Sequence, residues 1–105
     1  KVKQYVESRY GDSSLSLSEV AANLFLSPHY LRQLFRQETG VSFVEYVSQF
    51  RMERALLLLK DPTLKIQDIA EKVGFEEQRY FSSCFKKYCQ MTPTEYREAI
   101  QQGLV

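Results

Sequence analysis

Two segments of this sequence, residues 17–46 and 66–96, repeat one pattern of residue types. Val20-Ala21 recurs as Ile69-Ala70, at a shift of 49 positions. After one inserted residue the shift becomes 50 positions. At that shift Tyr30-Leu31 recurs as Tyr80-Phe81, Phe35 as Phe85, and Glu45-Tyr46 as Glu95-Tyr96. Each copy has the pattern of a short helix, a tight turn and a second helix. Two copies are too few for a solenoid, so the repeat predicts a tandem of two small units that share a function.

The length and composition of the chain fit a small folded domain. With 105 residues, 44% of them hydrophobic, it has the length of one domain or of two very small lobes that share an element. No run of about eighteen apolar residues is present, and the first ten residues are too polar for a signal peptide. We therefore expect a cytoplasmic protein without a membrane segment. The chain begins with Lys rather than Met, which favours a piece of a longer polypeptide whose sensing part lies upstream.

Residues suited to metal or catalytic chemistry are scarce. Cys84 and Cys89 are the only cysteines and His29 is the only histidine, and their spacing matches no metal-ligand or nucleophile pattern. The sequence also has no glycine-rich phosphate loop and no paired acid-base motif. We therefore expect no metal, no cofactor and no enzymatic activity, with both thiols reduced and packed in helices.

Helical signals cover nearly the whole chain, and no segment alternates apolar and polar residues strictly enough for a strand. Helix-start signals stand at Ser16 with Glu19, at Ser27-Pro28 and at Ser42 with Glu45, the first and last of these being capping boxes. The expected helices are 2–10, 17–24, 28–39, 43–60, 66–73, 78–88 and one opened by residues 92–95. The sequence thus predicts an all-α fold with lobe one (about residues 1–41), a connecting helix (about 42–61) and lobe two (about 62–105).

The second helix of each unit has a basic, hydrogen-bonding face opposite an apolar one. Successive residues of a helix are about 100° apart. In the helix of the first unit, this places Leu31, Leu34 and Phe35 on one side and His29, Arg32, Gln33 and Arg36 on the other. In the helix of the second unit, it places Phe81, Cys84 and Phe85 on one side and Arg79, Ser82, Ser83 and Lys86 on the other. Residues 27–37 and 78–88 together hold five of the fourteen Lys and Arg residues and none of the thirteen Asp and Glu residues. Nucleic acid binding requires such a local field, even where the net charge is only +1.

A basic face on a single helix is usually only solvated. Its presence on both second helices, each after a short turn, favours helix-turn-helix units in which the second helix enters the major groove of DNA. The alternative is a helical protein-interaction module that binds an acidic partner with the same faces. Glu76 and Glu77, at the start of the second such helix, repel phosphate, so we expect the second unit to bind DNA more weakly.

The connecting helix sets a spacing between the two units. Its eighteen residues, 43 to 60, measure about 27 Å at about 1.5 Å each, and successive major grooves on one face of DNA are about 34 Å apart. Its apolar residues include Phe43, Val47, Phe50, Ala55 and Leu58, which fits a rod packed against both lobes. For Arg51 and Arg54 we expect salt bridges with Glu side chains in preference to DNA contacts.

The order and spacing of many residues resemble the AraC/XylS family of bacterial transcription regulators. The resemblance lies in Ile66-Gln67-Asp68-Ile69-Ala70, Gly74-Phe75, Tyr80-Phe81, Phe85-Lys86-Lys87 and residues 92–97, and in residues 27–31 and Phe35 of the first half. It implies a seven-helix domain with two helix-turn-helix lobes that binds double-stranded promoter DNA and usually activates transcription. At Gln90 the family commonly has the Gly that this chain keeps at Gly40, so we expect an altered helix end there.

The resemblance and the outward faces together assign the DNA contacts. Base-reading contacts are expected from His29, Arg32, Gln33, Gln78, Arg79, Ser82 and Ser83, and phosphate contacts from Ser27, Tyr30, Arg36, Lys86, Lys87 and Thr92. RNA polymerase is the expected protein partner, and an upstream receiver or small-molecule sensor domain is expected in the full-length regulator. Because the outward residues of the two units differ, we expect one domain to bind an asymmetric site.

Overall fold

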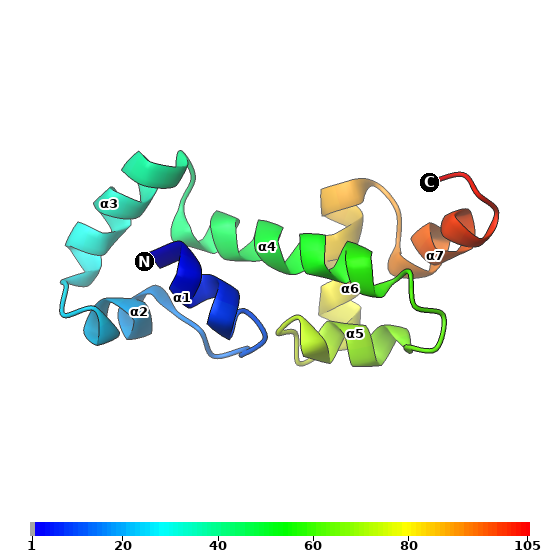
Figure 1. Ribbon diagram of the computed structural model, residues 1–105, viewed down its shortest axis with the longest axis horizontal. Helices are drawn as coiled ribbons and strands as arrows, with labels where there is room; N and C mark the ends of the chain where they lie inside the picture. The colour runs from blue at the N-terminus through cyan, green and yellow to red at the C-terminus, as the bar shows by residue number, and fades with distance from the viewer. Residues whose placement is uncertain (1) are drawn as a thin grey trace.

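The computed structural model describes residues 2–105 and shows seven helices in an elongated arrangement of 47 × 23 × 21 Å (Figure 1). They are α1 (Val2–Arg9), α2 (Leu17–Asn23), α3 (Pro28–Thr39), α4 (Phe43–Leu58), α5 (Ile66–Lys72), α6 (Gln78–Cys89) and α7 (Pro93–Gln101). No strand is present in residues 2–105. α4 runs along the molecule, with α1–α3 at one end and α5–α7 at the other. The predicted all-α fold with two helix-turn-helix lobes on a connecting helix is confirmed.

Hydroxyl caps start four of the helices, α2, α3, α4 and α7. The side-chain oxygens of Ser27, Ser42 and Thr92 each accept a hydrogen bond from the backbone N–H three residues later, at 3.1 Å. Glu45 returns to the backbone N–H of Ser42 at 3.0 Å, and Glu95 returns to that of Thr92 at 2.9 Å. These two reciprocal capping boxes fix the first turns of α4 and α7.

The capping box expected at Ser16 and Glu19 is only half formed. Ser16 Oγ accepts the N–H of Glu19 at 3.1 Å. The Glu19 carboxylate instead forms an ion pair with Arg9 at 2.8 Å and accepts the hydroxyl of Tyr5 at 3.2 Å. The prediction of a complete box is wrong because α1 offers this carboxylate a charged donor, which binds it more strongly than a backbone amide does.

Each lobe has its own hydrophobic core, and α4 contributes to both. The lobe-one core contains Val6, Val20, Ala21, Leu31 and Phe35 together with Phe43 and Val47 from the first half of α4. The lobe-two core contains Met52, Ala55 and Leu59 from the second half of α4 and its end, together with Ile69, Ala70, Val73, Phe75, Phe81 and Phe85. Phe50 and Leu58 are half-buried. α4 is therefore the predicted rod that packs against both lobes.

The connecting helix is shorter than expected, and its arginines make different contacts. α4 ends at Leu58, and its 16 residues measure about 24 Å at about 1.5 Å each. Arg51 donates to the backbone carbonyl oxygens of Tyr10 and Asp12, at 2.9 Å each. Arg54 donates to the Tyr10 hydroxyl at 3.3 Å. The expected salt bridges with Glu are wrong, because the loop after α1 folds onto α4 and supplies neutral oxygen acceptors.

The expected alteration of the α6 end at Gln90 is also wrong. Gln90 has a φ of 69°, and its N–H donates to the carbonyl of Lys86 at 2.8 Å. Gly40 ends α3 in the same way, with a φ of 80° and a bond of 2.8 Å to the carbonyl of Arg36. Gln90 therefore makes the same helix-ending hydrogen bond as Gly40, in a left-handed conformation that costs about 1 kcal/mol for a residue other than glycine.

Candidate nucleic-acid interface

The two helix-turn-helix units share one turn geometry. In lobe one, the N–H of Leu26 donates to the carbonyl of Ala21 at 2.9 Å, and in lobe two the N–H of Phe75 donates to that of Ala70 at 2.8 Å. The residue before each donor has a positive φ, and this left-handed step ends the first helix and redirects the chain. α3 and α6 therefore leave equivalent turns, as the repeat predicts.

α3 buries its apolar side and exposes the side with the predicted DNA contacts. Leu31 and Phe35 lie in the lobe-one core. The exposed side chains of α3 and its cap include Ser27, His29, Tyr30, Arg32, Gln33 and Arg36. The Ser27 oxygen is occupied by the cap, but its hydroxyl proton can still be donated to an outside acceptor such as a phosphate oxygen.

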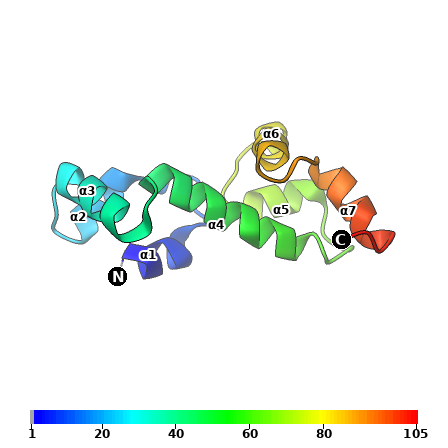
Figure 2. The same cartoon turned by 90° about the horizontal axis from the view of Figure 1, so that it is seen from above.

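α6 repeats this arrangement in lobe two. Phe81 and Phe85 are fully buried. The exposed side chains are those of Gln78, Arg79, Ser83, Lys86 and Lys87, with Ser82 half-buried on the same helix and Thr92 half-buried at the start of α7. The Ser83 hydroxyl donates to the carbonyl of Arg79 at 3.2 Å, so its oxygen is left as an acceptor. α6 crosses one side of α4, and α1 lies on the other side (Figure 2).

The cations on these two faces have no acidic partner in the part of the chain that the structure describes. Both ion pairs found there involve Arg9, which pairs with Asp12 at 2.6 Å and with Glu19 at 2.8 Å. The exposed cations outside these pairs include Arg32, Arg36, Arg79, Lys86 and Lys87. A phosphate can therefore bind them without first displacing an internal carboxylate.

The capping boxes of α4 and α7 place one carboxylate near a cation of α3 and another near a cation of α6. The backbone N–H of Ser42, then its side chain, lowers the pKa of Glu45, and the charge of Arg36 adds to this effect. In lobe two the equivalent cap, with a contribution from Lys86, lowers the pKa of Glu95. Both carboxylates are therefore charged at neutral pH, and each lies near a cation of the adjoining exposed face.

The start of α6 differs from that of α3 in its charge. Glu77 is the N-cap residue of α6 and makes no side-chain cap hydrogen bond. Glu76 accepts the hydroxyl of Ser13 at 3.1 Å. Both carboxylates belong to exposed residues that directly precede α6 and stand within three positions of Arg79 in the sequence, whereas the neutral Ser27 caps α3. Weaker DNA binding by the second unit stays a prediction, and this difference in charge is its physical basis.

Metal-ligand clusters, membrane-spanning helices and the two thiols can each be assessed in residues 2–105. No group of three or more His, Cys, Asp and Glu residues is placed to hold a metal ion there. In the same residues, no helix combines the length and the apolar character needed to cross a membrane. Cys84 and Cys89 are both half-buried thiols, and burial raises the pKa of Cys89.

Comparison with known proteins identifies these two units. A family model for a helix-turn-helix domain matches residues 20–99, which include both turns and both exposed faces. The arabinose operon regulatory protein of Escherichia coli is 35% identical over 99 residues, covering 94% of this chain and 34% of that protein. The chain belongs to the AraC-type helix-turn-helix family. This AraC-type domain is also 42% identical over 103 residues to the Msm operon regulatory protein of Streptococcus mutans, covering 98% of the domain and 37% of that protein.

A solved structure agrees with the AraC-type domain over nearly its whole length. It is the C-terminal domain of the two-component response regulator yesN from Fusobacterium nucleatum, with 45% identity and a TM-score of 0.88, over 91% of this chain and 93% of that chain. The chain spans about a third of the length of the curated relatives named above. It is the DNA-binding domain of an AraC-type transcription regulator, as its resemblance to the AraC/XylS family implies.

Ser42 is a candidate phosphate contact that the sequence assignment of the AraC-type domain omitted. It caps α4 as Thr92 caps α7, both are half-buried, and both hydroxyl oxygens accept an N–H at 3.1 Å. Each hydroxyl proton remains available to an outside acceptor. Since the two residues are 50 positions apart, the internal repeat itself carries the signal that relates them.

Proposed function

We propose that this AraC-type domain binds double-stranded promoter DNA sequence-specifically, with α3 and α6 in two successive segments of the major groove. The observation that carries the proposal is the pair of equivalent exposed faces whose five cations have no acidic partner among residues 2–105. α4, at about 24 Å, is shorter than the roughly 34 Å between successive grooves. We therefore expect a modest bend in the DNA, which costs about a few kcal/mol.

The exposed side chains divide into two roles by their chemistry. Arg32 and Arg79 suit bidentate contacts to guanine, and Gln33 and Gln78 suit adenine. His29, Ser82 and Ser83 complete the proposed base-reading set. The proposed phosphate contacts are Ser27, Tyr30, Arg36, Lys86, Lys87 and Thr92, with Ser42 added by the repeat. Contacts of the first kind set sequence preference, and those of the second set overall affinity and register.

The same proposal extends to the full-length regulator. We propose that residues 1–105 act as one DNA-binding domain of a bacterial activator that contacts RNA polymerase at the promoter. An upstream receiver or small-molecule sensor domain would control it, and the likeness to the C-terminal domain of a two-component response regulator supports a receiver. A cytoplasmic location follows from this function, since bacterial promoter DNA lies in the cytoplasm.

The salt dependence of DNA binding tests the proposal. A duplex is first selected from a random pool, and its affinity is measured by fluorescence anisotropy from about 50 to 200 mM salt. With about five to seven phosphate contacts, log affinity should fall against log salt with a slope of roughly −4 to −6. A slope near zero would contradict DNA binding. Tighter binding to an acidic polypeptide than to the selected duplex would instead favour the protein-interaction alternative, which the comparisons do not support.

A further inference from the structure

Arg51 lies at the meeting point of the two lobes. Its Nε donates to the carbonyl oxygen of Tyr10 and a terminal nitrogen donates to that of Asp12, each at 2.9 Å. Both carbonyls belong to the end of α1 and the loop that follows it. The guanidinium carbon lies 5.7 Å from the ring centroid of Phe75, in the turn before α6. One side chain of α4 therefore contacts lobe one and lobe two together.

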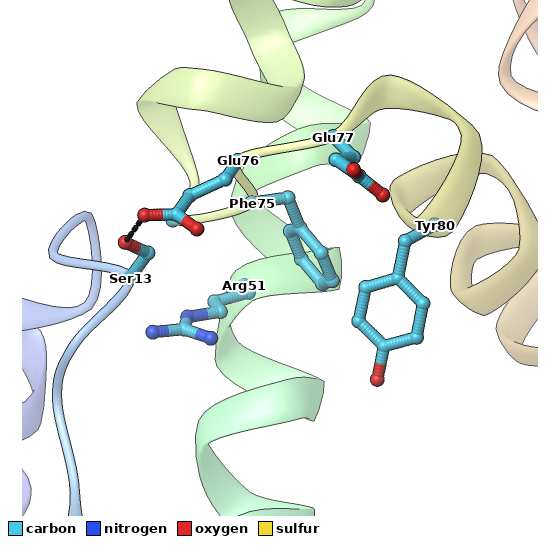
Figure 3. A pocket seen from close by; sticks show the side chains of 7 residues that line it. Ser13, Arg51, Phe75, Glu76, Glu77 and Tyr80 are labelled. Atoms are coloured by element: carbon cyan, nitrogen blue, oxygen red, sulfur yellow. Dashed lines mark hydrogen bonds between the residues drawn. The ribbon is translucent and has the colours of Figure 1, made fainter.

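The backbone of the lobe-two turn presses against these groups. A Cβ atom on Gly74 would lie 2.5 Å from the carbonyl oxygen of Tyr10 and 2.8 Å from Nε of Arg51. On the rim of the same contact, the hydroxyl of Ser13 donates to the carboxylate of Glu76 at 3.1 Å. Figure 3 shows the Arg51 side chain between the loop that bears Ser13 and the turn that bears Phe75.

The chemistry of the contact requires an arginine. The planar guanidinium can bond two carbonyl oxygens at once while its face lies over an aromatic ring, whereas a lysine ammonium is a point charge on a flexible stem. Desolvation lowers the pKa of Arg51, and the charge of Asp12 opposes that shift. Because the acceptors are neutral carbonyls, the bonds hold the loop without neutralising Arg51.

This contact bears on the placement of α6 relative to α3. Gly74 and Phe75 lie in the turn directly before α6, and the loop after α1 leads into α2, which precedes α3. A movement of one lobe about α4 would break the Arg51 bonds and the Ser13–Glu76 bond. We propose that Arg51 clamps the two lobes and thereby sets the spacing between half-sites that the domain accepts. This proposal rests on the proposed function, DNA binding by both α3 and α6.

The test compares Arg51→Lys with wild type on duplexes whose two selected half-sites are moved by −2 to +2 base pairs. Each base pair shifts one half-site by about 3.4 Å and about 35°. Wild type should lose about tenfold in affinity for each step, whereas Arg51→Lys should lose about threefold or less. Affinity for a duplex with a single half-site should stay within about twofold of wild type. Arg97→Lys is the matched control and should keep the wild-type profile, because Arg97 also donates to two backbone carbonyls, those of Leu59 at 3.3 Å and Asp61 at 3.0 Å, away from the contact between the lobes.

A folded Arg51→Lys variant with the wild-type spacing profile would overturn the clamp and leave DNA binding intact. Absence of salt-dependent binding by wild type to any selected duplex would overturn the proposed function itself. If Arg51→Lys does not fold, Ser13→Ala decides: it should flatten the profile in the same direction by about twofold or more, and an unchanged profile would overturn the clamp.

Discussion

Phe25 and Gly74 occupy the same position in the two helix-turn-helix turns, and both have a left-handed backbone, with φ values of 58° and 95°. Phe25 is 95% exposed, so no packing compensates for its strain. Gly74 is buried against the carbonyl of Tyr10 and the side chain of Arg51. One turn geometry is thus held in two environments, an open one in lobe one and a crowded one in lobe two.

Substitutions at these two positions should therefore have opposite effects on stability. Phe25→Gly removes a left-handed strain of about 1 to 2 kcal/mol from the folded state. Part of this gain is offset because glycine has more conformational freedom in the unfolded chain and loses more entropy on folding. We expect a net gain of about 0.5 to 1 kcal/mol in the free energy of unfolding. Gly74→Ala should lower it by more than about 1 kcal/mol, because its Cβ collides with backbone. Urea titration measures both; a loss of stability in Phe25→Gly would show that the side chain supports the turn.

Substitutions of Arg32 and Lys86 should have different effects on DNA binding, because Arg32 is proposed to read bases and Lys86 to bind phosphate. Arg32→Ala should lose preference at one or two base positions, at a cost of about 1 to 3 kcal/mol on the preferred sequence. Lys86→Ala should weaken all duplexes about equally and reduce the salt slope by about one. Both side chains are exposed, so stability should change by less than about 0.5 kcal/mol. Sequence selection on each variant is the measurement, and an Arg32→Ala profile identical to wild type would refute the base-reading role.

The capping boxes should make stability depend on acid pH. The backbone N–H of Ser42 holds the pKa of Glu45 below 4.5 in the folded domain, and that of Thr92 does the same for Glu95. The folded-state pKa is the lower one, so this stabilisation is complete above about pH 4.5 and is lost as pH falls through the folded values. The double variant Glu45→Gln with Glu95→Gln keeps the caps but cannot titrate.

Urea unfolding from pH 3 to pH 6 therefore distinguishes the double variant from wild type. Wild type should lose stability below about pH 4.5 more steeply than the variant does. Asp12, whose pKa Ser14 and Arg9 hold well below its usual value, is present in both proteins and cancels in the comparison. Parallel curves would mean that the two capping carboxylates titrate alike in the folded and unfolded states.

The sequence predicts the helices and the exposed faces because both depend on local patterns. Caps such as Ser27 and Ser42 act within one turn of helix, and the repeat places Phe35 and Phe85 on equivalent buried sides. The residue types on the opposite face, such as Arg32, can be read without knowledge of tertiary contacts. The roles assigned to individual side chains in DNA binding stay predictions until a complex or a variant tests them.

The features that the sequence did not predict depend on contacts between distant segments. Arg51 binds carbonyl oxygens about forty positions earlier in the chain, and backbone acceptors leave no mark on residue type. Glu19 leaves its capping box for Arg9 because α1 packs beside α2. In each case tertiary structure overrides a local preference.

The central claim is that one domain occupies two unlike half-sites with α3 and α6. Hydroxyl-radical footprinting on a selected operator, combined with the measured stoichiometry of the complex, tests it most directly. We predict one domain per duplex and two protected segments about 10 base pairs apart on one face, with different sequences in the two half-sites. A palindromic operator that shows protection only when two domains bind would contradict the account.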